Sequence, residues 1–464
     1  MSTPTGSAPS PASSRPTHAR YWVVVFAISL AVIQYIDRVA ISQAMPDISA
    51  EMKFSDAQKG MIFSAFTLAY ALFEIPTGWL GDKLGARSVL LRVVLWWSFF
   101  TAATGWAWNY VSMLVIRFLF GAGEAGCFPN LTKAFSTWLP KRDRTRAQAL
   151  MWMGARWGGA SAPLLVVLVM TFMSWRMAFL AFAGLGVVWA AIFYWWFRDN
   201  PRDHSGVNAA ELEMLKENEQ NVSGHGDVPW RALLTRPSMW LLWAQYFCLS
   251  YGWYFYVTWL PTYLAETSSV DLMNNVIMRT IGDGLAGIAA LFGSTLDQAV
   301  QVKLLNAARS GIPLFFGGIG ALVGGIVASR LVARRITVPV VRRALGVVGF
   351  TGASALLMTS FYIKDPVLTI LAMGMASFCN DLTMPGSWAS CMDIGGKYAG
   401  TVSGSMNMMG NFGGMAGPIV TGFVLAATSR DWQIVFAISS VIYFLGAVCW
   451  LFIDPVTPLE KEEG

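Results

Sequence analysis

Two adjacent charged residues, Asp37 and Arg38, stand in the middle of the apolar run 21–44. A helix of about 20 apolar residues can span a bilayer, and a charge at its centre costs roughly 2.5 to 3.5 kcal/mol. Gln34, Tyr35 and Arg38 fall on one helix face, so this face is expected to point into protein rather than lipid. A guanidinium group can hold a carboxylate through two parallel hydrogen bonds. We therefore take Arg38 as the ligand of an anionic substrate; the alternative is a structural ion pair with Asp37 or another acid.

A second charged pair, Arg117 and Glu124, stands two helical turns apart on one face of a later apolar run. We expect Arg117 to pair with Asp37. Ionised acids stabilise the arginines and protonated acids release them, so such a network can couple proton occupancy to a gate. A purely structural network is the alternative. Glu74 is a further acid, expected near a helix interface rather than at the centre.

Arg156 is a third cation inside an apolar run. It could hold a second carboxylate of a diacid, or it could balance Asp381, and the residues alone leave both readings open. Tyr70 and Tyr35 could bind substrate hydroxyl groups or be ordinary core tyrosines.

The second half of the chain offers neutral polar and aromatic groups suited to a hydroxylated carbon chain. These candidates are Ser387, Trp388, Asn407 and Asn411. The aromatic residues Tyr251, Trp253, Tyr254 and Tyr256 could serve in the same way, or could belong to an interfacial belt.

Composition excludes an ordinary soluble enzyme. The 464 residues are 55% hydrophobic and only 13% charged, and the mean hydropathy is +0.50. The five cysteines lack metal spacing, the three histidines lie in polar segments, and no nucleophile-base constellation or phosphate loop occurs. We expect no catalytic residues, metal or cofactor. The net charge of +6 comes from short loops, which argues for membrane topology and against nucleic-acid binding.

The apolar runs predict an all-α integral membrane protein with twelve transmembrane helices in two pseudo-symmetric six-helix bundles. We expect a disordered tail (1–20), an N-terminal bundle (21–199), a linker (200–236) with a surface helix at 209–218, a C-terminal bundle (237–454) and a short tail (455–464). Segment 265–303 is expected to be an extended loop on the outer side, of no assigned role. Basic loops on one side predict that both tails and the linker are cytoplasmic, as in a multi-pass protein of the inner or plasma membrane.

Internal repetition supports this division. Three patterns recur at offsets of 255 to 257 residues: 158–163 as 413–418, 124–129 as 380–385, and 175–179 as 432–436. Parallel six-helix repeats of this kind place a binding site between the two halves.

The loop after the second apolar run reads Gly78-Trp79-Leu80-Gly81-Asp82-Lys83-Leu84-Gly85-Ala86-Arg87. It resembles the signature loop of the major facilitator superfamily, and a degenerate copy at 325–334 has Ser329 in place of the acid. The resemblance covers essentially the whole chain. It implies that Gly78, Asp82, Lys83, Gly85 and Arg87 take part in gating.

Four stretches are similar to the anion:cation symporter family within that superfamily: 35–38, 117–129, 228–231 and 388–393 followed by Asn407 and Asn411. This resemblance implies inward, proton-coupled transport of an organic anion, with Asp37, Arg117 and Glu124 in proton coupling. We expect a hexonate, hexuronate or aldarate as substrate, and a monomer in the lipid bilayer. The alternative is a carrier of another carboxylate, dicarboxylate or phosphate ester that works by exchange or efflux.

Overall fold

The computed structural model describes residues 15–54, 56–218, 229–260, 298–363 and 366–459, with single positions at 263, 280, 283, 284 and 287. All regular elements in this part of the chain are helices. The first group comprises α1 (Ala19–Met52), α2 (Asp56–Leu84), α3 (Ala86–Gly105), α4 (Tyr110–Glu124), α5 (Cys127–Trp138), α6 (Lys141–Phe172) and α7 (Trp175–Trp196).

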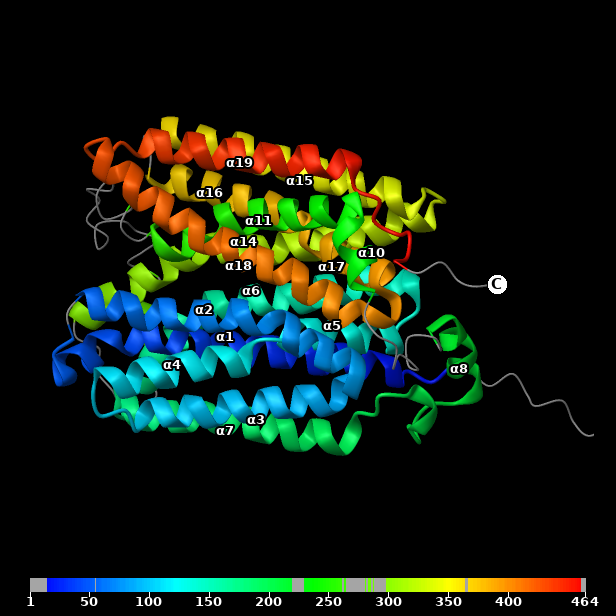
Figure 1. Cartoon of the computed structure of the whole chain (residues 1–464). Coiled ribbons are helices and arrows are strands. Elements are labelled where there is room, and N and C mark those ends of the chain that lie inside the picture. Colours follow the sequence, from blue (N-terminus) through cyan, green and yellow to red (C-terminus); the bar gives the residue numbers. More distant parts are fainter. Residues whose placement is uncertain are drawn as a thin grey trace, which may run out of the picture.

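Short helices follow before the second group of long ones. They are η1 (Pro201–Asp203), α8 (Ala209–Leu215), η2 (Lys216–Asn218) and α10 (Trp230–Thr235). The second group comprises α11 (Pro237–Thr258), α14 (Gln298–Ala333), α15 (Val338–Tyr362), α16 (Pro366–Leu382), α17 (Met384–Gly395), η4 (Gly396–Tyr398), α18 (Ala399–Ala427) and α19 (Trp432–Phe452). Figure 1 shows the long helices side by side, with α8 and α10 near one end of the bundle. We call this the linker end.

Ten segments of the described chain are long and apolar enough to cross a membrane. One of them, Leu368–Leu425, runs through α16, α17 and α18 and therefore contains two crossings. The helix α11 adds another, although its composition alone does not mark it as a span. The structure thus contains the twelve crossings that the apolar runs predict.

Two crossings differ from the continuous helices expected. The helix α4 ends directly after Glu124, because Gly126 adopts φ +85° and α5 starts again at Cys127. In the second half α16 ends at Leu382 and α17 restarts with Pro385 in its first turn, where a residue without an amide hydrogen is tolerated. The breaks fall inside the repeated segments 124–129 and 380–385, so the repeat marks a paired irregularity of the backbone.

The packing of the helices follows the same internal symmetry. In the first half α1 packs on α6 and α3 on α7, as α11 packs on α18 and α15 on α19 in the second. The halves meet along two seams, α6 against α14 and α18 against α2. Any site between the halves is therefore walled by these helices.

The start of the chain is more ordered than expected. Residues 15–20 belong to the segment predicted to be a disordered tail, yet Thr17 Oγ1 donates to Glu211 Oε2 at 2.6 Å and Arg20 pairs with Glu211 at 2.8 Å. Glu211 belongs to α8 and is buried, so the ion pair anchors the start of α1 to the linker. Residues 1–14 and most of the predicted loop 265–303 lie outside the described residues, and positions 298–303 of that loop belong to the helix α14.

Candidate functional site

A narrow cavity of about 40 Å³ lies between the two halves. Aromatic rings form much of its wall, and both halves contribute polar groups. The first half supplies Tyr35, Arg38, Tyr70 and Arg156, and the second supplies Tyr246, Ser250, Trp253, Tyr254, Asn407 and Asn411. Six of the eight residues expected to bind substrate therefore share one cavity.

Arg38 is the more accessible of the two cavity arginines. Its side chain is 19% exposed, and its Nε and Nη2 donate to the same oxygen of Glu124, at 2.9 and 2.6 Å. The guanidinium carbon also lies 4.8 Å from the ring centre of Tyr70 and 5.4 Å from that of Tyr35. Arg38 thus stands between a buried carboxylate and the open space of the cavity.

Glu124 is fully buried at the break between α4 and α5. Its Oε1 accepts from Arg38 and, at 2.8 Å, from the side-chain amide of Gln34, whereas its Oε2 has no hydrogen-bond partner among the described residues. A buried carboxylate that is only half satisfied is costly in its ionised form. The two oxygens of Glu124 therefore differ, since Oε1 is bonded to Arg38 and Gln34 and Oε2 is open.

The expected pair between Asp37 and Arg117 does not form. Within the described chain neither carboxylate oxygen of Asp37 has a hydrogen-bond partner. The guanidinium carbon of Arg117 lies 4.3 Å from the ring centre of Phe120 instead, and Glu124 takes Arg38 as its partner. Asp37 and Arg117 are both buried and interact only through their charges, so Asp37 is a second carboxyl group without a counter-ion at bonding distance.

Arg156 resolves one of the alternatives left by the sequence. Its Nε and Nη2 donate to the two carboxylate oxygens of Asp381, at 2.5 and 3.0 Å. Its Nη1 donates to the hydroxyl group of Tyr35 at 3.3 Å, and its guanidinium carbon lies 4.2 Å from a ring centre of Trp253. Arg156 therefore pairs with Asp381 and lines the cavity at the same time.

A second polar link crosses the halves beside the cavity. The side-chain amide of Asn407 donates to Glu74 Oε1 at 2.6 Å, and Asn411 Nδ2 donates to the backbone oxygen of Asn407 at 3.0 Å. Tyr254 donates from its hydroxyl to Asn411 Oδ1 at 3.4 Å. Glu74 lies at the α2–α18 seam as expected, with its Oε2 unpartnered among described residues.

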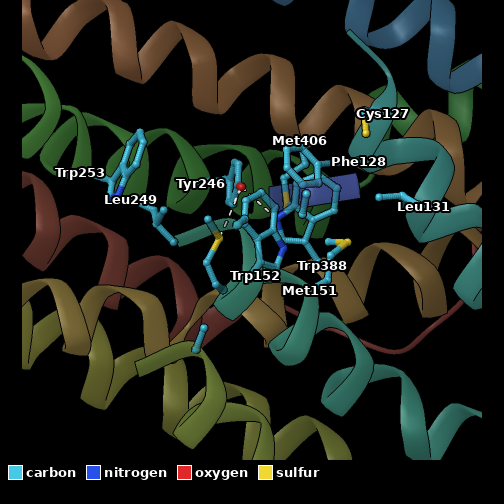
Figure 2. Close-up of a cluster of buried hydrophobic side chains, with 14 of the residues drawn as sticks. Cys127, Phe128, Leu131, Met151, Trp152, Tyr246, Leu249, Trp253, Trp388 and Met406 are labelled. Carbon is cyan, nitrogen blue, oxygen red and sulfur yellow. Dashed lines mark hydrogen bonds between the residues drawn. The ribbon is translucent and has the colours of Figure 1, made fainter. Parts of the chain in front are cut away.

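Two expected substrate ligands do not reach the cavity. Ser387 donates to Gln245 Oε1 and to the Thr383 backbone oxygen, both inside the second half. Trp388 is fully buried, and its indole nitrogen donates to the hydroxyl of Tyr246 at 2.9 Å. Figure 2 shows Trp388 against Trp152 and Phe128, with a dashed line to Tyr246. Because Tyr246 lines the cavity, Trp388 acts behind it and supports the wall.

Residues on α11 were only partly anticipated. Tyr246, Ser250, Trp253 and Tyr254 line the cavity, at the i, i+4, i+7, i+8 spacing of one helix face. Trp253 and Tyr254 were among the aromatic candidates, whereas Tyr246 and Ser250 were missed. The polar residue Ser250, on the same helix face as Trp253 and Tyr254, was a signal that the sequence offered, whereas Tyr246 gave none.

The signature loop joins the halves at the linker end. Asp82 accepts hydrogen bonds from the backbone amides of Gly400 and Thr401, at 3.0 and 2.7 Å, and from the Thr401 hydroxyl at 2.6 Å. These amides belong to the first turn of α18, where donors lack helical partners and a negative charge is favourable. Gly78 allows this approach, since a Cβ there would stand 2.4 Å from the Gly400 oxygen.

The rest of the loop contacts the first half. Gly85 adopts φ +86°, and the backbone amide of Arg87 donates to Asp199 Oδ1 at 2.9 Å. Burial raises the pKa of the Asp199 carboxyl, and the Arg87 amide and charge act in the opposite direction. Lys83 is exposed and its ammonium lies 5.0 Å from the Trp79 ring centre. The contacts of Asp82 and Gly78 therefore connect this loop to α18 of the second half.

The sequence profile of the Major Facilitator Superfamily matches residues 27–418. The chain belongs to this superfamily. A probable sulfoacetate transporter of Cupriavidus necator is 33% identical over 433 residues, 93% of each chain. A probable galactarate/D-glucarate transporter of Escherichia coli is 27% identical over 94% of this chain and 95% of its own, and a D-galactonate transporter of Escherichia coli is 24% identical over 95% and 97%.

Solved structures agree on the superfamily fold. The Escherichia coli fucose:proton symporter superposes with a TM-score of 0.65 at 16% identity, covering 94% of this chain and all of its own. The human organic anion transporter MFSD10 gives 0.64 at 15% identity, over 93% and 99%. This member of the superfamily is therefore a multi-pass membrane transporter rather than an enzyme. Its relatives by sequence are anion transporters of the anion:cation symporter family, which the four stretches beginning at 35–38 resemble.

Proposed function

We propose that the protein carries a small organic anion of the sugar-acid type into the cell together with protons, by alternating access of the cavity between the two halves. The observation that supports this most strongly is the pairing of Arg38 with Glu124 at the cavity wall. One arginine faces both a carboxylate of the protein and the space for a ligand. A substrate carboxylate and the Glu124 carboxylate therefore compete for the same cation.

Proton coupling follows from this competition. When Glu124 is ionised, its negative charge holds Arg38 and repels an incoming anion. When Glu124 takes up a proton at its unpartnered Oε2, the guanidinium of Arg38 becomes available to the substrate. Asp37, buried without a bonded counter-ion, is a second proton carrier in this proposal. Binding of the anion and of the proton then favour each other.

Substrate selection depends on the other wall residues. The amide groups of Asn407 and Asn411 and the hydroxyl groups of Tyr35, Tyr70 and Tyr254 are suited to substrate hydroxyls. Arg156, already paired with Asp381, offers a second positive site for an aldarate. The names of the galactarate/D-glucarate and D-galactonate transporters among the relatives support this class of substrate.

A smaller dianion is the second candidate. A cavity of about 40 Å³ holds little more than water in this conformation, so a six-carbon acid requires the wall to move. The 33% identity to a probable sulfoacetate transporter favours a short molecule with one acidic group at each end. In such a molecule the two groups would reach Arg38 and Arg156 together.

The proposed orientation places the linker end in the cytoplasm of a cell with the protein in its inner or plasma membrane. The signature loop carries Lys83 and Arg87, and the other basic loops lie on the same side. Two polar links between the halves lie on this side of Arg38: Glu74 with Asn407, and Asp82 with Thr401. We infer that the structure represents the form closed to the cytoplasm, and that the protein acts as a monomer.

Uptake by proteoliposomes tests the proposal. Purified protein is reconstituted with buffer at pH 7.5 inside, and labelled D-galactonate, galactarate and sulfoacetate are each offered at pH 6 and at pH 7.5 outside. The proposal predicts accumulation of at least one of them only under the inward proton gradient. Uptake that depends on an internal counter-anion and ignores the gradient would instead indicate an exchanger.

A further inference from the structure

A second cavity, of about 290 Å³, lies at the linker end and is separate from the one that contains Arg38. It is walled by the start of α6 in the first half and, in the second half, by the end of α14, the start of α15, α17 and the segment after α19. The cavity therefore straddles the α6–α14 seam. None of the transport residues proposed above lines it.

The inner wall of this cavity is apolar. Ala328 and Val332 of α14 and Val338 and Val341 of α15 contribute to it. Next to them Val340 is 54% exposed, so the apolar surface continues outward from the cavity. A small hydrophilic anion gains nothing from such a wall, whereas an acyl chain does.

The mouth of the cavity is cationic. Lys141 and Arg142 of α6 are both exposed, and Arg342 of α15 also lines the cavity but is buried, with its guanidinium bonded to Asp393 and the Pro455 backbone oxygen. Among the described residues that line the cavity, Asp393 is the acid, and it is bridged by Arg144 at 3.0 Å and by Arg342 at 2.7 Å. Its negative charge is therefore already balanced by two arginines.

Two further acids face this mouth from α6 and the linker. Asp143 lies 4.0 Å from Arg142, and Glu217 accepts a hydrogen bond from the backbone amide of Lys141 at 2.9 Å. Besides Arg342, the segment 329–363 adds four arginines and contains no acidic residue. The surroundings as a whole are strongly positive.

We propose that this cavity binds an anionic phospholipid, with the headgroup phosphate between Lys141, Arg142 and Arg342 and the start of an acyl chain along the valine-lined wall. Basic pockets between membrane helices on the cytoplasmic side are suited to anionic headgroups. The lipid would contact α6 of one half and α14 and α15 of the other, beside the Arg144–Asp393–Arg342 bridge, which joins α6 to α17 and α15. It would therefore stabilise the form in which the halves are closed at the linker end.

The experiment measures lipid binding to the purified, delipidated full chain in detergent. Thermal unfolding and native mass spectrometry are recorded with dioleoyl phosphatidylglycerol, with dioleoyl phosphatidylcholine, and with inorganic phosphate alone. Phosphatidylglycerol is expected to raise the melting temperature and to remain bound in the mass spectrum. Phosphatidylcholine, which has no net charge, and phosphate, which has no acyl chain, are expected to do much less.

Variants test whether phosphatidylglycerol binds in this cavity. Lys141→Ala with Arg142→Ala removes two exposed cations and is expected to weaken phosphatidylglycerol binding roughly tenfold. Ala328→Phe, which fills the apolar wall, is expected to weaken it without changing the charge. The matched control is Arg334→Ala with Arg335→Ala, which removes two exposed cations that do not line the cavity and should keep the binding.

Three outcomes would overturn the proposal. Equal loss in the control and in the Lys141 and Arg142 variant would mean that lipid is attracted by diffuse surface charge. An equal response to phosphate alone would indicate a soluble anion. The third outcome concerns residues 460–464, which contain three glutamates. If deleting them lowers thermal stability in lipid-free detergent and tightens phosphatidylglycerol binding, that acidic segment is the occupant.

Discussion

The carboxylate of Asp381 accepts two hydrogen bonds from Arg156, at 2.5 and 3.0 Å, across the boundary between the two halves. The bonds use Nε and Nη2, and Nη1 is directed to Tyr35. A buried ion pair of this kind fixes the guanidinium in one orientation at the cavity wall. It also links the halves, so any motion that separates α6 from α16 must break it.

Substitutions of this pair should separate substrates by charge. Arg156→Gln is expected to weaken binding of a dianion such as galactarate about tenfold and that of galactonate much less, because only a dianion has a second acidic group to place there. Asp381→Asn leaves a buried cation unpaired, which typically costs about 3 to 5 kcal/mol of stability, and should lower the melting temperature markedly. Ligand-dependent thermal shifts measure both effects. Equal weakening of both anions by Arg156→Gln would mean that Arg156 serves the bridge to Asp381 alone.

Arg38→Lys should abolish most binding of every transported anion. Lysine keeps the charge but offers no planar fork, and its shorter reach cannot satisfy Glu124 and a substrate at once. We expect at least a tenfold loss of affinity, about 1.4 kcal/mol, measured by equilibrium binding of labelled substrate. The control is Arg92→Lys on α3, outside the cavity, which should bind normally. Full uptake by Arg38→Lys would remove Arg38 from the mechanism.

Asp82→Asn should loosen the linker end. The Asp82 carboxylate accepts hydrogen bonds from the backbone N–H groups of Gly400 and Thr401. The asparagine side chain has no negative charge, so its interaction with the N-terminus of α18 is weaker. We expect faster hydrogen exchange at residues 399–403 in the variant. Asp199→Asn is the matched control, because Asp199 bonds the Arg87 amide within the first half. Unchanged exchange at 399–403 in Asp82→Asn would contradict a role for Asp82 in holding the closed form.

The sequence predicted the fold and most of the cavity because charged residues inside apolar runs are rare enough to be informative. Arg38, Glu124 and Arg156 were all found in this way, as was the partner Asp381. The pairing itself was predicted less well. The predicted pair of Asp37 with Arg117 does not form, and Glu124 takes Arg38 instead. Which acid meets which arginine depends on how far α1 and α4 are rotated, and residue types do not encode that rotation.

Ser387 and Trp388 show the second limit of sequence reasoning. Both lie on α17, after the break that follows Leu382, and their polar atoms bond Gln245, Thr383 and Tyr246 inside the second half. They were chosen for residue type alone, which does not distinguish a side chain that lines the cavity from one that supports its wall. Tyr246 was missed because an aromatic residue in an apolar run gives no sign of whether it faces a cavity or the core.

The central claim is that Glu124 takes up a proton when Arg38 leaves it to bind the substrate. Glu124→Gln imitates the protonated form permanently and preserves the side-chain size, so the anion site should survive while its link to the proton gradient is lost.

The decisive measurement compares two modes of transport in proteoliposomes containing Glu124→Gln: accumulation of labelled substrate driven by an imposed pH gradient, and exchange against unlabelled substrate at equal pH. We expect exchange to persist at near the normal rate and gradient-driven accumulation to vanish. Normal accumulation in this variant would contradict the account, and would assign the proton to Asp37 or Glu74.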